Sequence, residues 1–585
     1  MAYLKLSITT DTLGCGNRAL GSLKSVLFIV LLSCSLSSQP LRAQTSNPIP
    51  PIRPLVPSQP TPPLLPPPED LFQLPTPTQV PVQAPLNIPG TITVERFEVV
   101  GSTAFSPEVL ANVTAKFTRR SLTFVELLQA AAAITQLYVD QGYTTSGALI
   151  PANQKFQAKG GVVKIQVLEG SLEEIQVRGT QRLDPGYVRS RLAVATAAPL
   201  NIKRLLAALQ LLKLDPLLRN ISAELATGTS PGKNLLMITV SEADTFQSQF
   251  SLDNSRSPSV GSEKRQVQFT EANLLGLGDT LSLAYANTDG SNAINASYTL
   301  PINPYNGTLQ FGFSTTSSTV IESPFNILDI NATSRSYDLT LRQPILQTPA
   351  QEIALGMTLD RRESETSLLG IPFPLSAGAD DQGNTRITAL RFFQELTQRD
   401  SQTVIALRSQ LSIGLDVLGA TLNATAPDTR FFAWRGQAQY VRLLAPDTLL
   451  LVRGDLQLAD RALVPLEQIG LGGQQNIRGY RQDTLLTDNG AFASTELRVP
   501  VLRIPEIGGI LHLTPFIDFA SGWNSSNRSN PNPNTLVSGG LGLLWRQSDY
   551  FTAQFSWGIP FISVSGNKNT WQENGLYFSL SYSPF

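Results

Sequence analysis

The chain has almost none of the side chains on which catalysis and metal binding usually depend. It contains one histidine, His512, and two cysteines, Cys15 and Cys34, which both lie near the N-terminus. No nucleophile–histidine–acid set, metal-ligand cluster or phosphate-binding loop is visible, so we expect no catalytic residues, no metal and no cofactor. Charged residues make up only 15% of the chain, and the net charge is −1. This balance gives no electrostatic reason to expect nucleic-acid binding.

A hydrophobic run long enough to cross a bilayer as a helix is also missing. The apolar run Val26–Leu32 is far shorter than such a span, follows two basic residues and precedes a small-residue stretch that ends near Ala43. This order predicts a secretory signal peptide over residues 1–43. Its removal takes both cysteines away, which suits an oxidising envelope compartment. The alternative is a lipid-attachment box in which Cys34 becomes the acylated terminus.

Residues 44–90 are rich in proline and do not have the composition of a folded core. Such a segment favours the extended polyproline II conformation. We expect a semi-rigid periplasmic linker, with a docking strip for a cell-wall or envelope partner as the alternative. Within it, only Pro68–Leu74 could form a turn or two of helix.

Two segments of similar size follow, and each has the order strand, helix, helix, strand, strand. The first spans 91–170 and the second spans 171–244, which indicates an internal repeat of two small α/β modules. Each opens with a strand that ends in glycine followed by a hydroxyl residue, in VERFEVVGST and in LEEIQVRGTQ. In the first module, Thr123 is the expected N-cap of the second helix and Gly142 its expected end. The expected elements lie at 91–100, 106–118, 123–141, 144–150 and 161–168, and then at 172–178, 184–192, 201–214, 221–227 and 234–240.

From residue 245 to residue 585 the pattern changes to segments of about ten residues in which apolar and polar side chains alternate. Leu281, Leu283 and Tyr285, for example, alternate with small or polar neighbours. Such alternation places one face toward lipid and the other toward a lumen, as a closed transmembrane sheet requires. The segments lie near 246–254, 263–273, 278–288, 293–302, 307–319, 334–346, 350–361, 383–395, 402–415, 430–442, 446–458, 491–503, 510–521, 535–546, 549–559 and 575–585.

The number of segments predicts an antiparallel transmembrane β-barrel of about sixteen strands, wide enough for an aqueous lumen. A pair of soluble β-sandwiches is the alternative. We expect most charged side chains of the polar face to line a hydrated pore, and His512 to be one more lumen side chain. The charged residues on this face are Arg408, Arg453, Asp455, Glu496, Arg498 and Asp518.

Two segments of this region stand out: Glu467–Arg481, which reads EQIGLGGQQNIRGYR, and Pro515–Trp523, which reads PFIDFASGW. The glycines of the first segment permit backbone conformations that other residues rarely adopt. Arg478 carries a rigid, permanently charged guanidinium group, and Asp518 is a carboxylate that can accept its hydrogen bonds. By the alternation of its strand, Asp518 faces the lumen. The pattern therefore predicts a loop at about 459–490 that folds back into the pore and is held there.

The two modules resemble polypeptide-transport-associated (POTRA) domains, and the two motifs resemble the signature motifs of two-partner secretion transporters. These transporters form the haemolysin/haemagglutinin secretion-activation family, within the POTRA-containing outer-membrane assembly superfamily. The resemblance covers about residues 91–585. It implies a loop-tip motif and an inner-wall motif that meet through an arginine and an aspartate. The implied loop-tip residues are Gly472, Gly473, Ile477, Arg478, Gly479 and Tyr480, and the implied wall residues are Phe516, Asp518 and Gly522.

The resemblance also implies a function and partners. Modules in the periplasm capture an unfolded exoprotein, expected to be β-helical and recognised through its N-terminal region, and the outer-membrane barrel passes it to the cell surface. The further partners are outer-membrane lipid and the barrel-assembly machinery, which reads a C-terminal strand ending at Phe585. An assembly factor that inserts other barrel proteins is the alternative, and a porin-like diffusion channel comes next. Family members often begin with a helix that plugs the pore, and the proline-rich start departs from that pattern.

Overall fold

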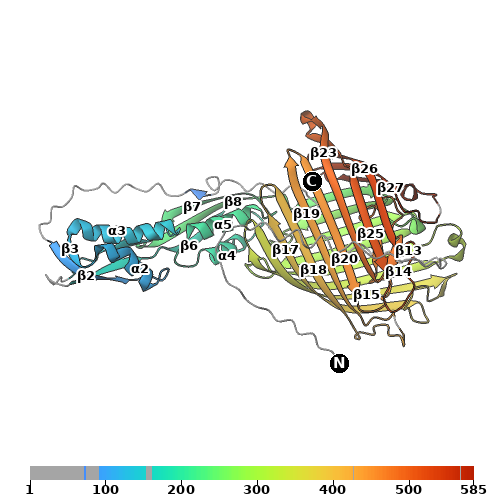
Figure 1. Ribbon diagram of the computed structural model, residues 1–585, viewed down its shortest axis with the longest axis horizontal. Helices are drawn as coiled ribbons and strands as arrows, with labels where there is room; N and C mark the ends of the chain where they lie inside the picture. The colour runs from blue at the N-terminus through green and yellow to red at the C-terminus, as the bar shows by residue number, and fades with distance from the viewer. Residues whose placement is uncertain are drawn as a thin grey trace, which may run out of the picture. The chain divides into compact units, whose positions relative to one another are not determined.

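The computed structural model describes residues 72–73, 91–152, 154, 161–425, 427–566 and 568–584 (Figure 1). The predicted signal peptide, the alternative of lipidation at Cys34, and the terminal Phe585 all lie outside these residues. Every helix in the described ranges is too short or too polar to cross a membrane.

The first module is a four-stranded sheet with the order β3-β2-β5-β4, together with two α-helices. Leu127, Ile134 and Tyr138 of the longer helix are buried in one cluster with Val163 and Ile165 of the sheet. The elements are β2 (Thr91–Val100), α2 (Pro107–Thr114), the 3-10 turn η1 (Ala115–Phe117), β3 (Arg120–Thr123), α3 (Phe124–Asp140), β4 (Gly147–Leu149) and β5 (Gly161–Leu168).

Local sequence explains where α3 begins and ends. The Thr123 side chain accepts a hydrogen bond from the backbone N–H of Glu126 (3.3 Å), and the Glu126 carboxylate accepts one from the Thr123 N–H (2.8 Å). This capping box confirms Thr123 as the N-cap. Gly142 follows the helix with a φ of +93°, a conformation that glycine adopts without strain.

Three details of the first module differ from the prediction. The strand expected at 144–150 is only three residues long, and the helix expected at 106–118 gives way to a 3-10 turn after residue 114. β3 is not part of the predicted order. It exists because residues 120–123 pair antiparallel with residues 91–94 of β2. Such pairing, rather than local propensity, decides whether a short edge segment becomes a strand.

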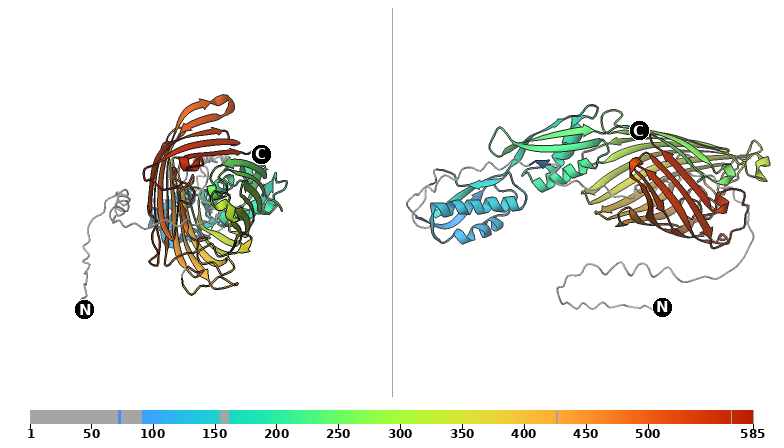
Figure 2. Two further views of the ribbon diagram at one scale, coloured as in Figure 1. Left: turned by 90° about the vertical axis from the view of Figure 1, so that its right-hand side faces the viewer. Right: turned by 90° about the horizontal axis from the view of Figure 1, so that it is seen from above.

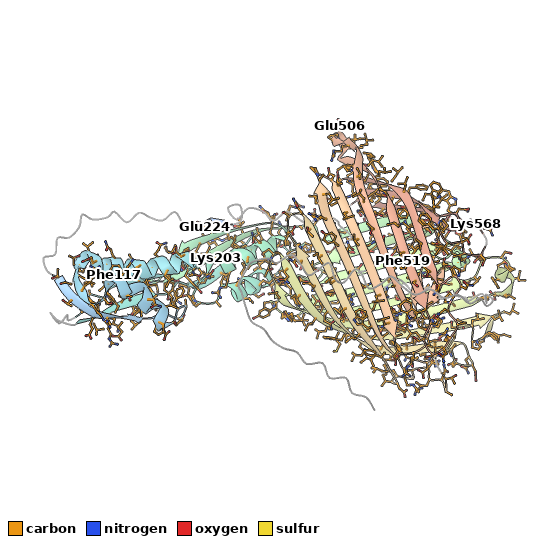
Figure 3. All side chains as sticks on the ribbon, viewed as in Figure 1. Phe117, Lys203, Glu224, Glu506, Phe519 and Lys568 are labelled. Atoms are coloured by element: carbon orange, nitrogen blue, oxygen red, sulfur yellow. The ribbon has the colours of Figure 1, made fainter. Side chains whose placement is uncertain are left out.

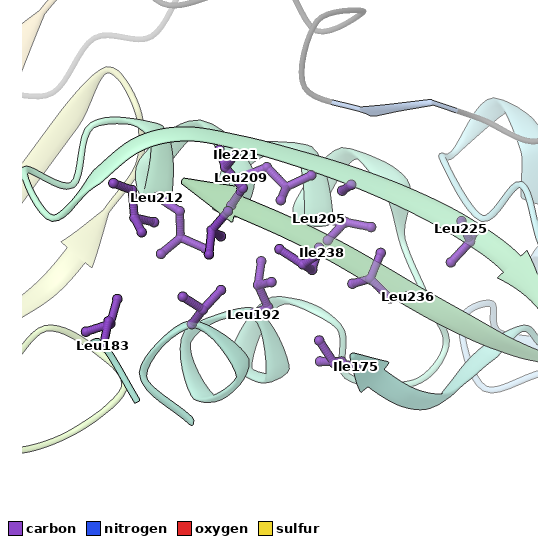
Figure 4. Packing of buried hydrophobic residues seen from close by; sticks show 14 of the residues in the cluster. Ile175, Leu183, Leu192, Leu205, Leu209, Leu212, Ile221, Leu225, Leu236 and Ile238 are labelled. Carbon is purple, nitrogen blue, oxygen red and sulfur yellow. The ribbon is translucent and has the colours of Figure 1, made fainter. Parts of the chain in front are cut away.

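The second module has the predicted order of elements. Leu205, Leu209 and Leu212 recur at helical spacing and are buried with Ile221 and Ile238 of the sheet, as Figure 4 shows. Burial of this apolar face holds the helix on the sheet. The elements are β6 (Ser171–Arg178), α4 (Pro185–Ala195), α5 (Ile202–Lys213), β7 (Leu218–Thr227) and β8 (Lys233–Glu242).

A short strand from the proline-rich segment lies at the edge of this second sheet. β1 (Phe72–Gln73) pairs in parallel with β7, opposite Ala223 and Glu224, so the sheet order is β1-β7-β8-β6. Glu224 is labelled in Figure 3. The turn of helix allowed at Pro68–Leu74 is wrong for these two residues, because they pair with β7 as a strand.

In both modules a glutamate accepts hydrogen bonds from the backbone that follows the first strand. Gly101 and Gly179 end the first strands with φ of +86° and +89°, and a Cβ on either residue would collide with a backbone carbonyl of the neighbouring strand. Glu169 accepts hydrogen bonds from the N–H groups two and three positions after Gly101, at 2.7 and 2.9 Å. Glu242 accepts them from the N–H groups three and four positions after Gly179, at 3.1 and 3.0 Å. This repeated geometry explains why both modules open with the same glycine motif.

The rest of the described chain forms a closed barrel and its connections. The strands are β9 (Phe246–Asp253), β10 (Lys264–Ala272), β11 (Thr280–Thr288), β12 (Ser291–Pro301), β13 (Thr308–Thr319), β14 (Asn331–Gln347), β15 (Gln351–Leu368), β16 (Ile371–Pro372), β17 (Asn384–Arg399), β18 (Thr403–Leu415), β19 (Phe432–Ala445), β20 (Thr448–Ala459), β23 (Asn489–Ile504), β24 (Gly509–Leu513), β25 (Phe516–Trp523), β26 (Thr535–Gln547), β27 (Phe551–Pro560) and β28 (Leu576–Tyr582). The connections hold the 3-10 turns η2 (Pro258–Val260), η3 (Phe325–Leu328), η4 (Pro505–Ile507) and η5 (Gln572–Asn574).

Sixteen antiparallel strands close the ring, as predicted (Figure 2). β16 and β24 are not counted as separate strands of the ring. β16 is a two-residue extension that pairs only with the end of β15. β24 and β25 are two halves of one strand, because both pair with β23 and with β26. The ring closes where β28 pairs with β9.

Alternate residues of the wall face opposite sides, which β25 illustrates. Ile517 is 55% exposed and Phe519, labelled in Figure 3, is 41% exposed, whereas Phe516 and Asp518 are buried. The exposed apolar side chains form the face that suits lipid. The opposite face is polar and lines the lumen, so a segment that contacts Asp518 lies inside the barrel.

Candidate functional site

The connection from β20 to β23 is the predicted in-folded loop. It contains a short hairpin of β21 (Ile469–Leu471) and β22 (Leu485–Thr487). Gly472 and Gly473 follow the first hairpin strand with φ of +118° and +104°. The Asn476 side chain ties the turn together, because it accepts hydrogen bonds from the N–H groups of residues 472 and 477 and donates one to the carbonyl of residue 470. These hydrogen bonds therefore fix the conformation of the turn at the loop tip.

The tip of this loop binds the barrel wall through Arg478 and Asp518. Nε and Nη2 of Arg478 donate to the two oxygens of Asp518, both at 2.9 Å, and the Arg478 backbone N–H donates to one of them at 3.1 Å. Ser494 on β23 also donates to this carboxylate, at 2.7 Å. Arg478 is 2% and Asp518 1% exposed. This buried bidentate pair fixes both the position and the direction of the loop tip.

Glu496 on β23 is a second carboxylate at the same site. Arg478 donates to it through Nη1, and Arg498 donates to its other oxygen at 2.9 Å. These four side chains pair two positive with two negative charges, and Arg453 on β20 adds a third positive charge nearby, where it donates to the Gln475 carbonyl of the loop at 3.2 Å. Paired, hydrogen-bonded charges are tolerated in a buried site, whereas removal of one partner leaves another charge uncompensated.

The Arg478 guanidinium also lies over the ring of Phe516, with its carbon 3.4 Å from the ring centroid. Phe516 has room because β26 has glycine opposite it: a Cβ on Gly540 would lie 2.5 Å from the tip of the ring. The first residue of the predicted wall motif thus contacts the guanidinium directly. Gly522, its last residue, lies close to the hairpin, because a Cβ there would lie 2.6 Å from the Thr487 hydroxyl.

Gly479 and Tyr480 continue the contact of the tip with the last strands. The Tyr577 hydroxyl on β28 accepts a hydrogen bond from the Gly479 N–H (3.0 Å) and donates to the Tyr480 carbonyl. The Tyr480 hydroxyl reaches the Val537 carbonyl on β26 at 2.8 Å. A Cβ on Gly558 of β27 would lie 2.7 Å from the Arg478 carbonyl carbon, so only glycine fits there. Close backbone contact, as well as charge, seats the loop.

Ile477 and Tyr480 of the predicted tip motif are buried in one apolar cluster with Leu471, Ala520 and Leu536. The structure therefore brings the predicted loop and wall residues into a single site. Beyond the tip, the last arginine of the loop motif pairs with glutamates outside it, at residues 322 and 573. The loop is held at several points of the barrel.

Sequence reasoning missed several residues of this site. Glu496 appears in the sequence only as one of several charges on the polar face, and the prediction treats most of these as hydrated lining. The structure instead pairs it with Arg478 and pairs Asp455 with Arg435 at 2.7 Å. Tyr577 follows the alternation of the last strand without any signal that singles it out. Across the described ranges, no group of three or more His, Cys, Asp or Glu side chains is placed to hold a metal ion.

A sixteen-stranded barrel that holds an in-folded loop and follows small α/β modules is the architecture of polypeptide transporters of the outer membrane. Residues 232–544, more than half of the chain, match the family model described as haemolysin secretion/activation protein ShlB/FhaC/HecB. The chain therefore belongs to this family, whose members carry out two-partner secretion. Residues 92–170 match the POTRA domain of ShlB type. The chain is an outer-membrane protein-secretion transporter with POTRA domains, which are periplasmic in this family.

Relatives and solved structures agree with this assignment. The outer membrane transporter CdiB of Dickeya dadantii is 22% identical over 454 residues, which are 76% of this chain and 78% of that protein. The heme/hemopexin transporter protein HuxB of Haemophilus influenzae is 23% identical over 401 residues, 66% of this chain and 68% of that one. The structure of CdiB from Escherichia coli matches with a TM-score of 0.66 at 19% identity, covering 86% of this chain and 93% of that chain. These matches favour secretion over the alternative of a barrel-assembly factor.

Proposed function

We propose that this transporter passes one large exoprotein through the barrel lumen in extended form, and that the in-folded loop is the gate. The buried pair of Arg478 and Asp518 supports this most strongly. When the tip leaves the wall, both charges must exchange their hydrogen bonds for water or for other partners, so the pair favours the seated position of the tip. The resting gate is therefore closed, and passage of a client requires the tip to leave the wall.

The second module offers a place to capture the client. Among the described residues, β7 is followed at the edge of its sheet by the two-residue strand β1, which pairs with two of the ten residues of β7. A sheet edge pairs with an extended chain through backbone groups, largely independent of the sequence of that chain. The parallel pairing of β1 supports the view that this edge accepts an extended strand. The proposed client is a β-helical exoprotein, recognised through its N-terminal region while it is still unfolded.

The proposed organisation follows from these roles. The C-terminal strand is the proposed recognition element for the barrel-assembly machinery, with Phe585 as its last residue. Nothing in the charge balance calls for nucleic acid, and no catalytic step is proposed. The proposed parts are a signal peptide at 1–43, a linker at 44–90, periplasmic modules at 91–170 and 171–244, and a barrel at 245–585 with its gate loop at about 459–490.

The test replaces either member of the pair, in Arg478→Ala and Asp518→Ala. Both variants should insert and fold as barrels, because the sixteen strands do not depend on the loop. Release of the client should nevertheless fall well below that of the unaltered protein, because a loop that has lost its seat no longer moves between two defined positions. Surface abundance of the transporter and the amount of released exoprotein are measured together. Asp455→Ala is the matched control, since it breaks a wall pair with Arg435 that does not involve the loop. Normal release from both loop variants would remove the pair from the mechanism.

A further inference from the structure

The loop that enters the barrel has a second ionic contact, in the limb that precedes the hairpin. The Glu467 side chain is 6% exposed, and its carboxylate accepts hydrogen bonds from both terminal nitrogens of Arg391 on β17, at 2.8 and 3.0 Å. Arg362 on β15 donates to the same carboxylate at 3.3 Å and to the Leu466 carbonyl at 3.2 Å. Two wall arginines therefore hold one carboxylate of the loop. We call this contact the Glu467 anchor, and the contact at Asp518 the Arg478 anchor.

Asp360 on β15 completes the Glu467 anchor. Arg391 donates to its two oxygens at 3.2 and 3.1 Å, and Arg362 lies 2.7 Å from it. Asp338 on β14, opposite Asp360, is a further acid beside Arg362. Without Glu467, Arg391 loses a carboxylate that accepts from both of its terminal nitrogens, and removing one partner of a buried ion pair is costly. The wall at β15 and β17 is thus complementary to an acid delivered by the loop.

The two anchors have opposite polarity. The loop supplies a carboxylate, Glu467, to arginines on β15 and β17, and an arginine, Arg478, to carboxylates on β23 and β25. A loop docked the other way round would place like charges together at both ends. Repulsion in the wrong arrangement gives specificity as effectively as attraction in the right one. The pair of anchors therefore fixes the direction in which the loop lies in the lumen.

The two anchors also belong to separate apolar clusters. Leu463 and Leu466, just before Glu467, are buried with Ile387 of β17. Ile477, next to Arg478, is buried with Ala520 of β25. Each part of the loop thus has its own ionic contact and its own hydrophobic contact with a different part of the wall. Interactions that share no partners contribute independently.

We propose that Glu467 is a second, independent positioning residue of the gate, which keeps the entry limb on β15 and β17 when the Arg478 anchor opens. The loop then swings its tip away from β25 while it stays attached at the entry limb. A pivot of this kind explains how the lumen clears without full unfolding of the loop, and how the tip finds its seat again. This inference rests on the proposed function of the loop as a gate.

The test labels single cysteines in each part of the loop of the full-length protein, in a chain that also carries Cys15→Ser and Cys34→Ser. Val464→Cys reports on the entry limb and Ile477→Cys on the tip, because both side chains are fully buried. Each reporter is combined with Glu467→Gln or with Arg478→Ala, and the rate of maleimide labelling is measured. Folding of each barrel is checked by the shift in gel mobility on heating.

Glu395→Gln is the matched control for Glu467→Gln. Glu395 is also a buried lumen acid held by two arginines, Arg342 at 2.8 Å and Arg408 at 2.7 Å, and all three lie on the wall. If the effect came from a general loss of negative charge in the lumen, both glutamine variants would show it equally.

The expected result separates the two anchors. Glu467→Gln should raise labelling at position 464 by at least about tenfold over the control, the ratio that corresponds to 1.4 kcal/mol. Arg478→Ala should expose position 477 while position 464 stays protected. Equal labelling at 464 in Glu467→Gln and in Glu395→Gln overturns the Glu467 anchor, and so does an Arg478→Ala variant that exposes both positions alike. A tip that stays protected in Arg478→Ala counts against the gate itself, whereas labelling at 464 in Glu467→Gln still decides the anchor.

Discussion

The guanidinium carbon of Arg478 lies 3.4 Å from the centre of the Phe516 ring. Phe516 precedes Asp518 by two residues, and Asp518 accepts hydrogen bonds from the same guanidinium group. One short stretch of wall therefore supplies both a negative charge and an aromatic face to the same cation. A cation over a ring in a desolvated site gains about 2 kcal/mol. The ring is thus part of the wall surface that holds the loop tip, although its neighbours Ile517 and Phe519 face lipid.

Phe516→Leu tests the contribution of that ring. It keeps an apolar side chain but removes the π face, so the fraction of time that the gate is open should rise by about tenfold or more, from a loss of about 2 kcal/mol. Single-channel recording of the purified protein in planar bilayers measures this fraction. Phe393→Leu is the control, because its ring covers Arg408 at 4.1 Å on the wall. The same change in both variants would assign the effect to the wall and not to the seat.

Gly558→Ala tests whether close backbone contact matters independently of charge. The added methyl group would press on the backbone of residues 478 and 479, and no side-chain partner is removed. We expect the tip to be displaced and the pore to open more often, with the barrel still folded. Gly454→Ala is the control, since a Cβ there meets its nearest neighbour at an ordinary 3.6 Å. Identical recordings from the two alanine variants would contradict the prediction.

Tyr577→Phe removes one hydroxyl that binds the backbone of Gly479 and Tyr480. The buried N–H and carbonyl lose their partner, which costs about 1–3 kcal/mol and should raise the open fraction by roughly five- to a hundredfold. The matched variant is Tyr298→Phe, whose hydroxyl binds Asp279 away from the loop. Channel recordings that match those of the unaltered protein would show that the last strand does not hold the tip.

Glu169→Gln tests the contact between Glu169 and the backbone that follows the first strand of the first module. Partial burial acts to raise the pKa of Glu169, but hydrogen bonds from Thr103, Ala104 and Tyr138 outweigh it and hold the pKa below its ordinary value. A carboxyl whose pKa is lower in the folded state stabilises the fold above its unfolded-state pKa of about 4.3, and this contribution disappears as the pH falls through the folded-state value. The variant should therefore unfold at lower urea concentration at pH 7.

The same comparison should show a smaller difference between the variant and the unaltered protein at pH 3 than at pH 7. All α-helices in the described residues lie in the two modules, so circular dichroism at 222 nm follows module unfolding in the full-length protein. Glu98→Gln, at an exposed position on β2, is the control and should leave the urea midpoint unchanged. If the difference in urea midpoint between Glu169→Gln and the unaltered protein stays constant from pH 7 to pH 3, the proposed linkage is contradicted.

Much of this fold could be predicted because it depends on local periodicity. Alternating side chains locate the sixteen strands, most of them within a few residues at each end, although β15 runs to Leu368 where the prediction ended at 361. Helical spacing with good caps locates α3 and α5. Neither β3 nor β1 could be predicted from the sequence, and the reason is the same for both. Each is a short segment whose strand conformation comes from pairing with residues distant in sequence, and its own residues give no signal.

The candidate site could be predicted only in part. Arg478 and Asp518 lie in motifs that carry a family resemblance, so their meeting could be expected. The contacts of Glu496 and Tyr577 with the loop, and the wall partners of Glu467, could not be predicted in the same way. Which wall residues face it depends on how the ring closes and on the stagger of its strands, and these are properties of the whole barrel. Alternation tells which side of the wall a residue faces, but not what it meets there.

The hydrogen bonds of Gly479 and Tyr480 to Tyr577 also bear on biogenesis. The acceptor of the Gly479 N–H lies 98 residues further along the chain, in the final strand. A transporter caught midway through insertion, with that strand still unplaced, lacks both of these hydrogen bonds to its loop tip. Complete seating of the tip therefore coincides with completion of the cylinder.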